Sequence, residues 1–313
     1  NVGGCGLGFE GFARLIASSH LQNLKVLQAQ NNSIGDMGIE ALLMTPALKS
    51  LEELHLTESR EGRYEEDPVI TGQGLERLAT WPGLSQIRSL TLDGNNLSDA
   101  GVNALLHSPH IGNLKSLSLA ETGLHSTAIE SFANAGFRAK LEDLNLSGNW
   151  LNGAGMSYLA KAKCLEDLKV LKIHRCELRP DDARDLWEAK FISTVRMMNA
   201  AHNYFGSEGL ITLLEAKPKE LHTLLMQNNS LDSEGIASLA SSPASNSLLD
   251  LDLSLNRLDS LSMQALTNAE QLQHLRILKV SHCTQSEEVR DELQNSPLGK
   301  RLAVLEMDLS IPF

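Results

Sequence analysis

Two short segments place histidine beside cysteine, a combination that can bind zinc. They are His174-Arg175-Cys176 and His282-Cys283. A structural zinc site needs four side chains that converge on one ion. The repeat described below directs the histidines outward and the cysteines inward, so the two kinds of ligand point apart. We therefore expect no metal site and interpret both cysteines as buried structural residues.

Signatures of catalysis are absent from the sequence. It contains no G-x-x-x-x-G-K-[ST], H-E-x-x-H, G-x-S-x-G or C-x-x-C motif. Gly3, Gly4, Gly6 and Gly8 lack the G-x-G-x-x-G spacing of a phosphate-binding loop, and we interpret them as turn residues. We expect a protein that is not an enzyme, with no catalytic residues and no cofactor.

Composition narrows the classes of partner and location. The 27 basic and 39 acidic residues give a formal net charge of −12, which argues against a nucleic-acid partner, because such proteins need a basic face. No stretch approaches the roughly 18 apolar residues of a membrane helix, so we expect no membrane association. The four cysteines are scattered, which favours free thiols and a cytoplasmic location. Because the chain begins at Asn1 without a Met, we expect a piece of a longer protein.

An internal repeat accounts for almost the whole sequence. Eleven segments read apolar-x-x-apolar-x-apolar-x-x-(Asn/Cys/Ser/Thr). Successive starts lie 27 residues apart in eight of ten intervals, 26 apart once and 36 apart once. Such a period predicts a solenoid of stacked coils. The segments begin at Leu24, Leu51, Ile87, Leu114, Leu141, Leu168, Val195, Leu221, Leu248, Leu275 and Leu302, and a partial coil precedes them.

Each coil is expected to hold one strand and one helix. Positions four to six alternate apolar and polar, as in Leu144-Asn145-Leu146, which predicts a strand with one buried face. Further on, a recurrent Gly followed four residues later by Leu predicts a helix, with Asp36, Asp99, Asp232 and Asp259 as expected N-caps. Parallel strands lie about 4.8 Å apart and helices about 8–10 Å apart. Stacked coils must therefore fan, with the strands on the concave side.

The ninth position of the repeat predicts a row of buried side chains, which we call the ladder. An asparagine there can donate to and accept from backbone groups where the chain turns inward. Cysteine, serine or threonine replaces it in the other coils. The expected ladder is Asn32, Asn95, Asn149, Cys176, Asn203, Asn229, Asn256 and Cys283, with Ser59, Thr122 and Ser310 as weaker substitutes.

This repeat resembles the leucine-rich-repeat family, and its 27-residue period resembles the ribonuclease-inhibitor-like type. The resemblance implies an α/β fold, a right-handed solenoid curved into a horseshoe, with parallel β-strands on the concave face and helices on the convex face. It covers residues 1–313, which we expect to form a single leucine-rich-repeat domain of a partial N-terminal coil and about eleven repeats. Such a fold leaves the function open.

One interval contains nine extra residues, within residues 57–73. Its tip, from Glu58 to Asp67, is rich in charged residues, so we expect a loop that projects from the solenoid. Arg60 and Arg63 are the residues of this loop that we nominate as contacts with a partner.

Outward positions of coils five to seven carry the side chains most typical of a binding surface. Exposed Trp, Tyr and Arg dominate the energetics of protein interfaces. The alternative is that Trp150 and Tyr204 lie flat against neighbouring coils as packing. The candidate partner-binding residues are Asn145, Trp150, Lys172, His174, Arg175, Glu177, His202 and Tyr204.

From these observations we expect a non-catalytic recognition module that binds another protein on its concave face. Two alternatives stay open. The repeats also resemble those of Ran GTPase-activating proteins, which implies a regulator of a GTPase, and the chain is compatible with the sensor domain of a larger receptor or effector. Near the C-terminal end, an acidic cluster favours a basic partner surface: Asp250, Asp252, Glu306 and Asp308.

Overall fold

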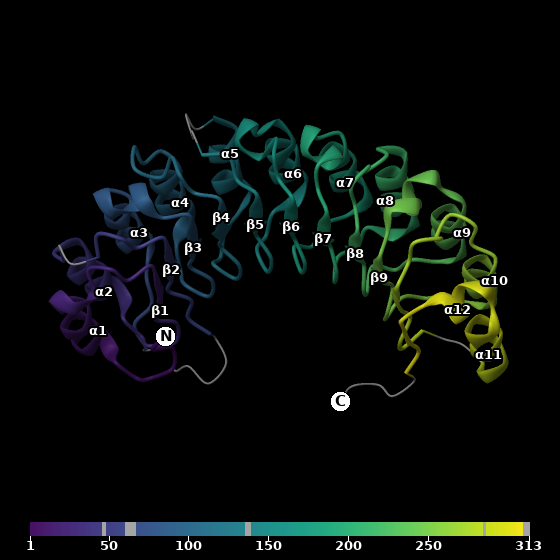
Figure 1. The fold of residues 1–313 in the computed structure, drawn as a ribbon. Coiled ribbons are helices and arrows are strands. Elements are labelled where there is room, and N and C mark those ends of the chain that lie inside the picture. Colours follow the sequence, from purple (N-terminus) through teal and green to yellow (C-terminus); the bar gives the residue numbers. More distant parts are fainter. Residues whose placement is uncertain (46–47, 60–66, 135–138, 284–285, 309–313) are drawn as a thin grey trace. The chain divides into compact units, whose positions relative to one another are not determined.

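The computed structural model describes residues 1–45, 48–59, 67–134, 139–283 and 286–308. The chain divides into two compact units, and each is considered by itself. Unit 1 comprises Asn1–Leu151 and Lys161–Leu168, and unit 2 comprises Asn152–Ala160 and Lys169–Phe313. Both units repeat the same coil of one short strand and one helix (Figure 1).

Unit 1 contains five parallel strands, each paired with the next strand along the chain. Its helices follow one another in the same order (Figure 1). The strands are β1 (Val26–Gln28), β2 (Glu53–His55), β3 (Ser89–Thr91), β4 (Ser116–Ser118) and β5 (Asp143–Asn145). The helices are α1 (Gly8–Ile16), α2 (Gly35–Leu43), α3 (Gly72–Leu78), α4 (Ser98–Leu106) and α5 (Ser126–Asn134), with 3-10 turns η1 (Ser19–Leu21), η2 (Pro82–Gln86) and η3 (Lys163–Leu165).

Unit 2 continues the pattern with six parallel strands, again paired in sequence order. The strands are β6 (Val170–Lys172), β7 (Met197–Asn199), β8 (Thr223–Leu225), β9 (Asp250–Asp252), β10 (Ile277–Lys279) and β11 (Val304–Glu306). The helices are α6 (Asn152–Lys161), α7 (Pro180–Trp187), α8 (Gly206–Glu215), α9 (Ser233–Ser241), α10 (Ser260–Thr267), α11 (Glu287–Asn295) and α12 (Pro297–Arg301), with 3-10 turns η4 (Lys190–Ser193) and η5 (Pro243–Ser247).

The strands occupy positions three to five of the repeat, one residue earlier than predicted. In β5, for example, the buried Leu144 lies between the half-buried Asp143 and Asn145. Leu146, which the prediction placed in the strand, follows it and is fully buried. Positions three and five therefore form the outward face of each sheet, and the leucines at positions four and six form its core.

Helices of successive coils pack closely within each unit. A glycine makes the approach between α3 and α4 possible, because a Cβ atom on Gly101 would lie 2.9 Å from the backbone of Gly72. The parallel strands and the helices that alternate with them confirm the predicted α/β fold of stacked repeats.

The predicted helix N-caps are confirmed in unit 2 and wrong in unit 1. Asp232 and Asp259 cap α9 and α10, each accepting a hydrogen bond from a backbone N–H in the first turn. Asp36 and Asp99 lie one residue inside α2 and α4, because these helices begin earlier. Their carboxylates accept hydrogen bonds from the following coil instead, as when Asp36 accepts from the backbone N–H of Thr71 at 2.7 Å.

Candidate partner-binding surface

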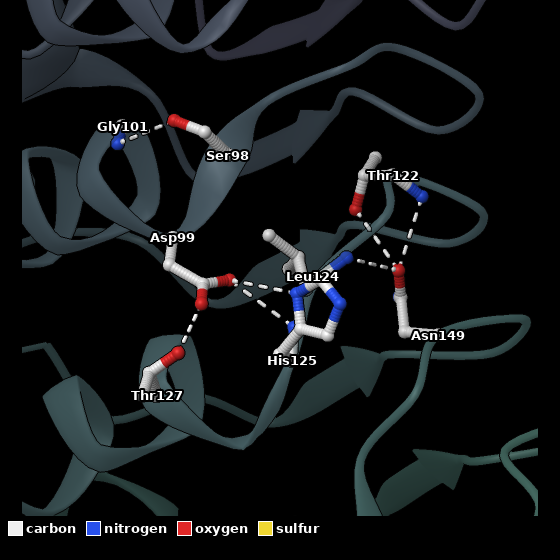
Figure 2. A network of polar contacts seen from close by, with 8 residues as sticks. All are labelled: Ser98, Asp99, Gly101, Thr122, Leu124, His125, Thr127 and Asn149. Atoms are coloured by element: carbon white, nitrogen blue, oxygen red, sulfur yellow. Dashed lines mark hydrogen bonds and ion pairs between the residues drawn. The ribbon is translucent and has the colours of Figure 1, made fainter.

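The asparagines of the ladder are buried and hydrogen-bonded to the backbone of their own and the preceding coil. Asn149 donates from Nδ2 to the carbonyl oxygens of Leu119 and Leu146, at 2.7 and 2.9 Å. Its Oδ1 accepts from the backbone N–H groups of Thr122 and Leu124, at 3.1 and 3.0 Å (Figure 2). One amide side chain thus satisfies four backbone groups that no strand pairing reaches.

The same arrangement occurs in unit 2. Asn203 donates to the carbonyl oxygens of Ile173 and Ala200, at 2.8 and 3.0 Å. Its Oδ1 accepts from the N–H groups of Cys176 and Leu178, at 3.0 and 3.1 Å. The remaining ladder asparagines are buried in equivalent bonds: Asn32, Asn95, Asn229 and Asn256.

Cysteine provides a weaker version of this contact. The thiols of Cys176 and Cys283 are buried and donate to carbonyl oxygens at 3.4 and 3.6 Å, those of His174 and Ser281. All four cysteines of the chain are free. Burial raises the pKa of the Cys164 thiol to about 12. The Cys164 thiol is therefore protonated and chemically inert at neutral pH, and burial also raises the pKa of the Cys283 thiol.

The insertion changes the ladder in the second coil, where two predictions were wrong. Ser59 was expected to take the ladder position, but it is exposed. Glu58 was expected in a projecting polar tip, but it is buried, and its carboxylate accepts from the backbone N–H groups of Asn32 and Ser33, at 3.3 and 2.8 Å. A longer side chain one position earlier thus reaches the turn of the preceding coil, and Glu58 takes over only the accepting part of the asparagine's role, because a carboxylate has no N–H to donate to the carbonyl oxygens. Arg60 and Arg63 lie outside the described residues.

In unit 1 the candidate surface includes Trp150, which follows β5 and leaves 60% of its surface exposed. Its ring packs against His125, with the ring centres 5.5 Å apart. The backbone N–H of His125 donates to Asp99 at 3.1 Å, and the hydroxyl of Thr127 donates to the same carboxylate (Figure 2). Trp150 is therefore supported at its base and open to solvent beyond it.

Asn145 lies on the outward face of the same unit, at the end of β5. It donates from Nδ2 to the hydroxyl of Ser118 in β4 at 2.9 Å. Its Oδ1 accepts from the backbone N–H of Ser147 at 3.2 Å. Both polar ends of Asn145 are thus engaged within the protein, which leaves it a supporting residue of the strand face.

In unit 2 the candidate residues follow β6 and β7. Tyr204 is 61% exposed, and Arg175 and Glu177 are exposed as well. His202 is half-buried, and its Nδ1 lies 3.2 Å from Nδ2 of Asn228. Burial and, secondarily, the positive charge of Arg175 lower the pKa of His202. Unit 2 therefore groups an aromatic, a guanidinium and an imidazole on neighbouring coils.

Lys172 and His174 are less exposed than the sequence predicted. Lys172 is half-buried in β6, opposite Asn199 of β7. His174 is also half-buried. Both lie beside the exposed residues of unit 2 and contribute less accessible surface.

The backbone reveals a feature that side-chain periodicity does not show. Position eight of the repeat has a positive φ in nearly every described coil, with glycine in three of them: Gly4, Asn31, Gly94, Glu121, Gly148, Arg175, His202, Asn228, Leu255 and His282. Leu255 at position eight and Arg257 two residues later, both in the coil of β9, are exposed. Neither was among the binding residues predicted from the sequence. Glycine at the same position in other coils was the signal that could have revealed the left-handed backbone.

Fewer carboxylates of the acidic cluster in unit 2 are accessible to a partner than predicted. Asp252 is buried and accepts from Nε2 of Gln227 at 2.6 Å. Glu306 forms an ion pair with Lys279 at 2.9 Å. Two of the four carboxylates are thus partnered inside the protein, which weakens the case for a basic partner there.

Among the described side chains, no three His, Cys, Asp or Glu residues come together closely enough to hold a metal ion. Within the same ranges, no helix combines the length and apolar character needed to cross a bilayer.

Comparison with known proteins finds one matching repeat and solved structures of similar fold. Residues 139–160 match a model described as Leucine Rich repeat. No curated protein sequence matches. A chain in the crystal structure of the yeast Rad7 and Elc1 complex has a similar fold, with 18% identity, a TM-score of 0.54 and coverage of 95% of this chain and 77% of that one.

A second solved structure, internalin C2 from Listeria monocytogenes, has 19% identity and a TM-score of 0.41, and covers 70% of this chain and 88% of that one. Residues 139–160 thus match a leucine-rich repeat, and the likeness to the Rad7 and Elc1 structure supports the fold of stacked coils.

Proposed function

We propose that this chain is a non-catalytic recognition module that binds another protein through the strand-bearing surface and the loops that follow the strands. Solenoids of this kind present extended rigid surfaces, and the 27-residue register supports assignment to the ribonuclease-inhibitor-like type. The observation that carries the proposal is the exposure of two large aromatics, Trp150 and Tyr204, on loops fixed by the ladder.

The ladder makes these loops rigid enough to serve as a binding surface. Asn149 and Asn203 directly precede Trp150 and Tyr204, and their side chains donate both to their own loop and to the preceding coil, so the loops do not need to be ordered when a partner binds. A preorganised surface loses less conformational entropy on association. Rigid exposed aromatics are also the residues that contribute most to interface affinity.

The proposal is tested by capturing proteins from a native lysate on the immobilised chain. Trp150→Ala and Tyr204→Ala are compared with Met37→Ala on α2 and Leu261→Ala on α10, whose side chains are 58% and 61% exposed. We expect at least one aromatic variant to lose the captured protein, whereas both helix variants retain it and all melting temperatures stay within about 2 °C. Identical capture by all four variants contradicts the proposal.

The GTPase-regulator alternative receives no support from the described residues. Its nominated contacts, Arg60 and Arg63, lie outside them.

A further inference from the structure

The loops that follow the strands form one edge of each unit, and in unit 1 this edge carries Trp150. We define the edge of unit 1 as its described residues from position seven of each repeat to the second residue of the next helix. Ladder side chains bond the backbone of these loops, so the edge is a fixed surface. It consists of residues 30–36, 57–59, 67–73, 93–99, 120–127 and 147–151.

Charge is distributed unevenly over unit 1. The described residues of the edge include neither Lys nor Arg but six carboxylates, those of Asp36, Glu58, Asp67, Asp93, Asp99 and Glu121. The sequence from Arg60 to Glu66 carries two arginines and three glutamates, so it does not reverse the sign. The remainder of unit 1 has ten acidic and ten basic residues. The net negative charge of the unit therefore belongs to its edge.

Uncharged donors hold two of these carboxylates in place. Asp36 accepts from the backbone N–H and the hydroxyl of Thr71, at 2.7 and 2.6 Å. Asp99 accepts from the backbone N–H of His125 and the hydroxyl of Thr127, and Nδ1 of His125 lies 3.8 Å away (Figure 2). Hydrogen bonds from N–H and O–H groups satisfy the oxygens of a carboxylate but add no compensating charge. Such an edge is electrostatically complementary to a basic partner.

Trp150 gives the edge an aromatic anchor. Its side chain is 60% exposed, its backbone N–H donates to the carbonyl oxygen of Leu124 at 3.0 Å, and its ring packs against His125. The exposed Glu121 lies over the same loop, because a Cβ atom on Gly148 would be 2.6 Å from its Cγ. The face of an indole ring attracts a cation. A ring accompanied by a carboxylate therefore favours a Lys or Arg side chain over a neutral or acidic one.

Three successive coils bring the carboxylates and the ring into one stretch of surface. The coils of Asp93, Glu121 and Trp150 follow one another, and their strands pair directly. Neighbouring parallel strands lie about 4.8 Å apart, so the two outer coils are about 10 Å apart, which an extended segment covers in about three residues. One partner segment can therefore place a basic side chain over Trp150 and another beside Glu121 or Asp93.

The same positions of unit 2 mix both signs of charge. The described loops there contain Arg175, Arg179 and Arg257 among carboxylates such as Glu177 and Asp259. A basic segment would meet like charges along that edge, and like charges across an interface disfavour binding. Of the two edges, that of unit 1 is the one suited to a basic partner.

We infer that the edge of unit 1 binds a basic segment of a partner protein, with one Lys or Arg side chain stacked on Trp150 and a second paired with Glu121 or Asp93. The inference rests on the proposed function and names the chemistry of the partner. Neutral apolar segments and acidic segments are the other occupants that the test must separate.

The test selects phage-displayed random peptides on the immobilised chain at about 150 mM salt, where long-range attraction is screened. Enriched peptides are synthesised with a fluorescein label and titrated by fluorescence polarisation. Trp150→Leu removes the aromatic ring and keeps an apolar side chain, whereas Trp150→Phe keeps a ring. Position ten holds serine, asparagine, glycine or glutamate in other coils, so both variants are expected to fold.

A second pair of variants tests the charge. Asp93→Asn/Glu121→Gln removes two carboxylates from the edge with little change in side-chain size. The matched control, Glu10→Gln/Glu76→Gln, removes two carboxylates from exposed positions on α1 and α3. Glu121→Gln is also measured alone, because its side chain is exposed and any effect of Asp93→Asn on folding then does not decide the result. Melting temperatures are recorded for every variant.

We expect the enriched peptides to contain at least two Lys or Arg residues. Trp150→Leu and the edge double variant should each raise their Kd by about tenfold or more, and Trp150→Phe and the control by no more than about threefold. Four results overturn the inference: no enrichment, enriched peptides without Lys or Arg, unchanged binding by Trp150→Leu, or equal loss in the two double variants.

This test is independent of the test of the proposed function. If the selected peptides lack basic residues while Trp150→Ala or Tyr204→Ala still loses the captured lysate protein, the recognition function stands and this inference fails. If capture from lysate is the same for all four variants of that experiment, the proposed function itself is contradicted.

Discussion

The two units have the same interior and different edges. Asn149 in unit 1 and Asn203 in unit 2 make the same four backbone hydrogen bonds, with lengths that agree within about 0.1 Å. At the position directly before the ladder residue, unit 1 places glycine in three coils but Asn31 and Glu121 in two others, whereas unit 2 places arginine, histidine, asparagine and leucine. The interior of a coil is therefore constrained by backbone hydrogen bonds, whereas its edge is free to vary with function.

Within unit 1, the second coil shows how strong that constraint is. In this coil, which carries the insertion, Ser59 does not take the asparagine position, and a buried carboxylate, Glu58, accepts hydrogen bonds from the backbone N–H groups of the preceding turn. Its neighbourhood in turn fixes Gly94, which has no room for a side chain. Unit 1 thus has a residue at its edge determined by packing, where unit 2 has residues that packing does not explain.

The largest effect expected from this comparison is loss of a ladder asparagine. Asn149→Ala and Asn203→Ala should each lower the free energy of unfolding by about 3–5 kcal/mol, because several buried backbone groups lose their partners. Asn113→Ala, at an exposed site with a single hydrogen bond to Ser85, should lower it by less than about 1 kcal/mol. Urea titrations monitored by circular dichroism measure all three. Losses in the two units that differ by more than about 2 kcal/mol would show that their interiors are not equivalent.

A second prediction contrasts the edges directly. Gly94→Ala should destabilise the protein by about 3 kcal/mol, because the new Cβ meets the Glu58 carbonyl oxygen and φ is +72°. Leu255→Gly should change stability by less than about 1 kcal/mol, because relief of the left-handed strain offsets the lost contacts.

Leu261→Gly on α10 is the control for that comparison, since it removes an exposed leucine from a helix. It should cost about 1 kcal/mol. If Leu255→Gly proves more harmful than Leu261→Gly, then Leu255 is a packing residue and the contrast between the edges fails. Thermal and urea unfolding of the three variants decide the point.

The sequence predicted the coil well, because leucine periodicity reports burial and burial determines strand and helix. It also indicated Trp150 and Tyr204 as outward residues. It did not predict the position of Glu58, because an insertion breaks the register on which the alignment depends. Nor did it reveal the left-handed positions: φ of Leu255 depends on the backbone, and its side chain looks like any other apolar residue of the repeat.

The smallest effect concerns the strand face of unit 2. Burial, then the nearby carboxylates of Asp252 and Glu306, raise the pKa of Asp250, and Lys279 opposes them. A carboxyl group with a raised pKa stabilises the fold fully only below its unfolded value near 3.8, and that contribution is lost as the pH rises through the folded value. Asp250→Asn should therefore raise the melting temperature by about 1 °C at pH 7 and by less near pH 4. A gain that is the same at both pH values would contradict this cause.

The most direct measurement of the central claim is site-specific photocrosslinking in unit 2. A benzoylphenylalanine is placed at Tyr204 in the loop after β7 or at Leu261 on α10, two side chains that are each 61% exposed. After irradiation in lysate, we expect a covalent adduct with a discrete protein from the variant at position 204 and none from the variant at position 261. Adducts of equal yield from both positions, or an adduct from position 261 alone, would contradict recognition by the strand-bearing surface.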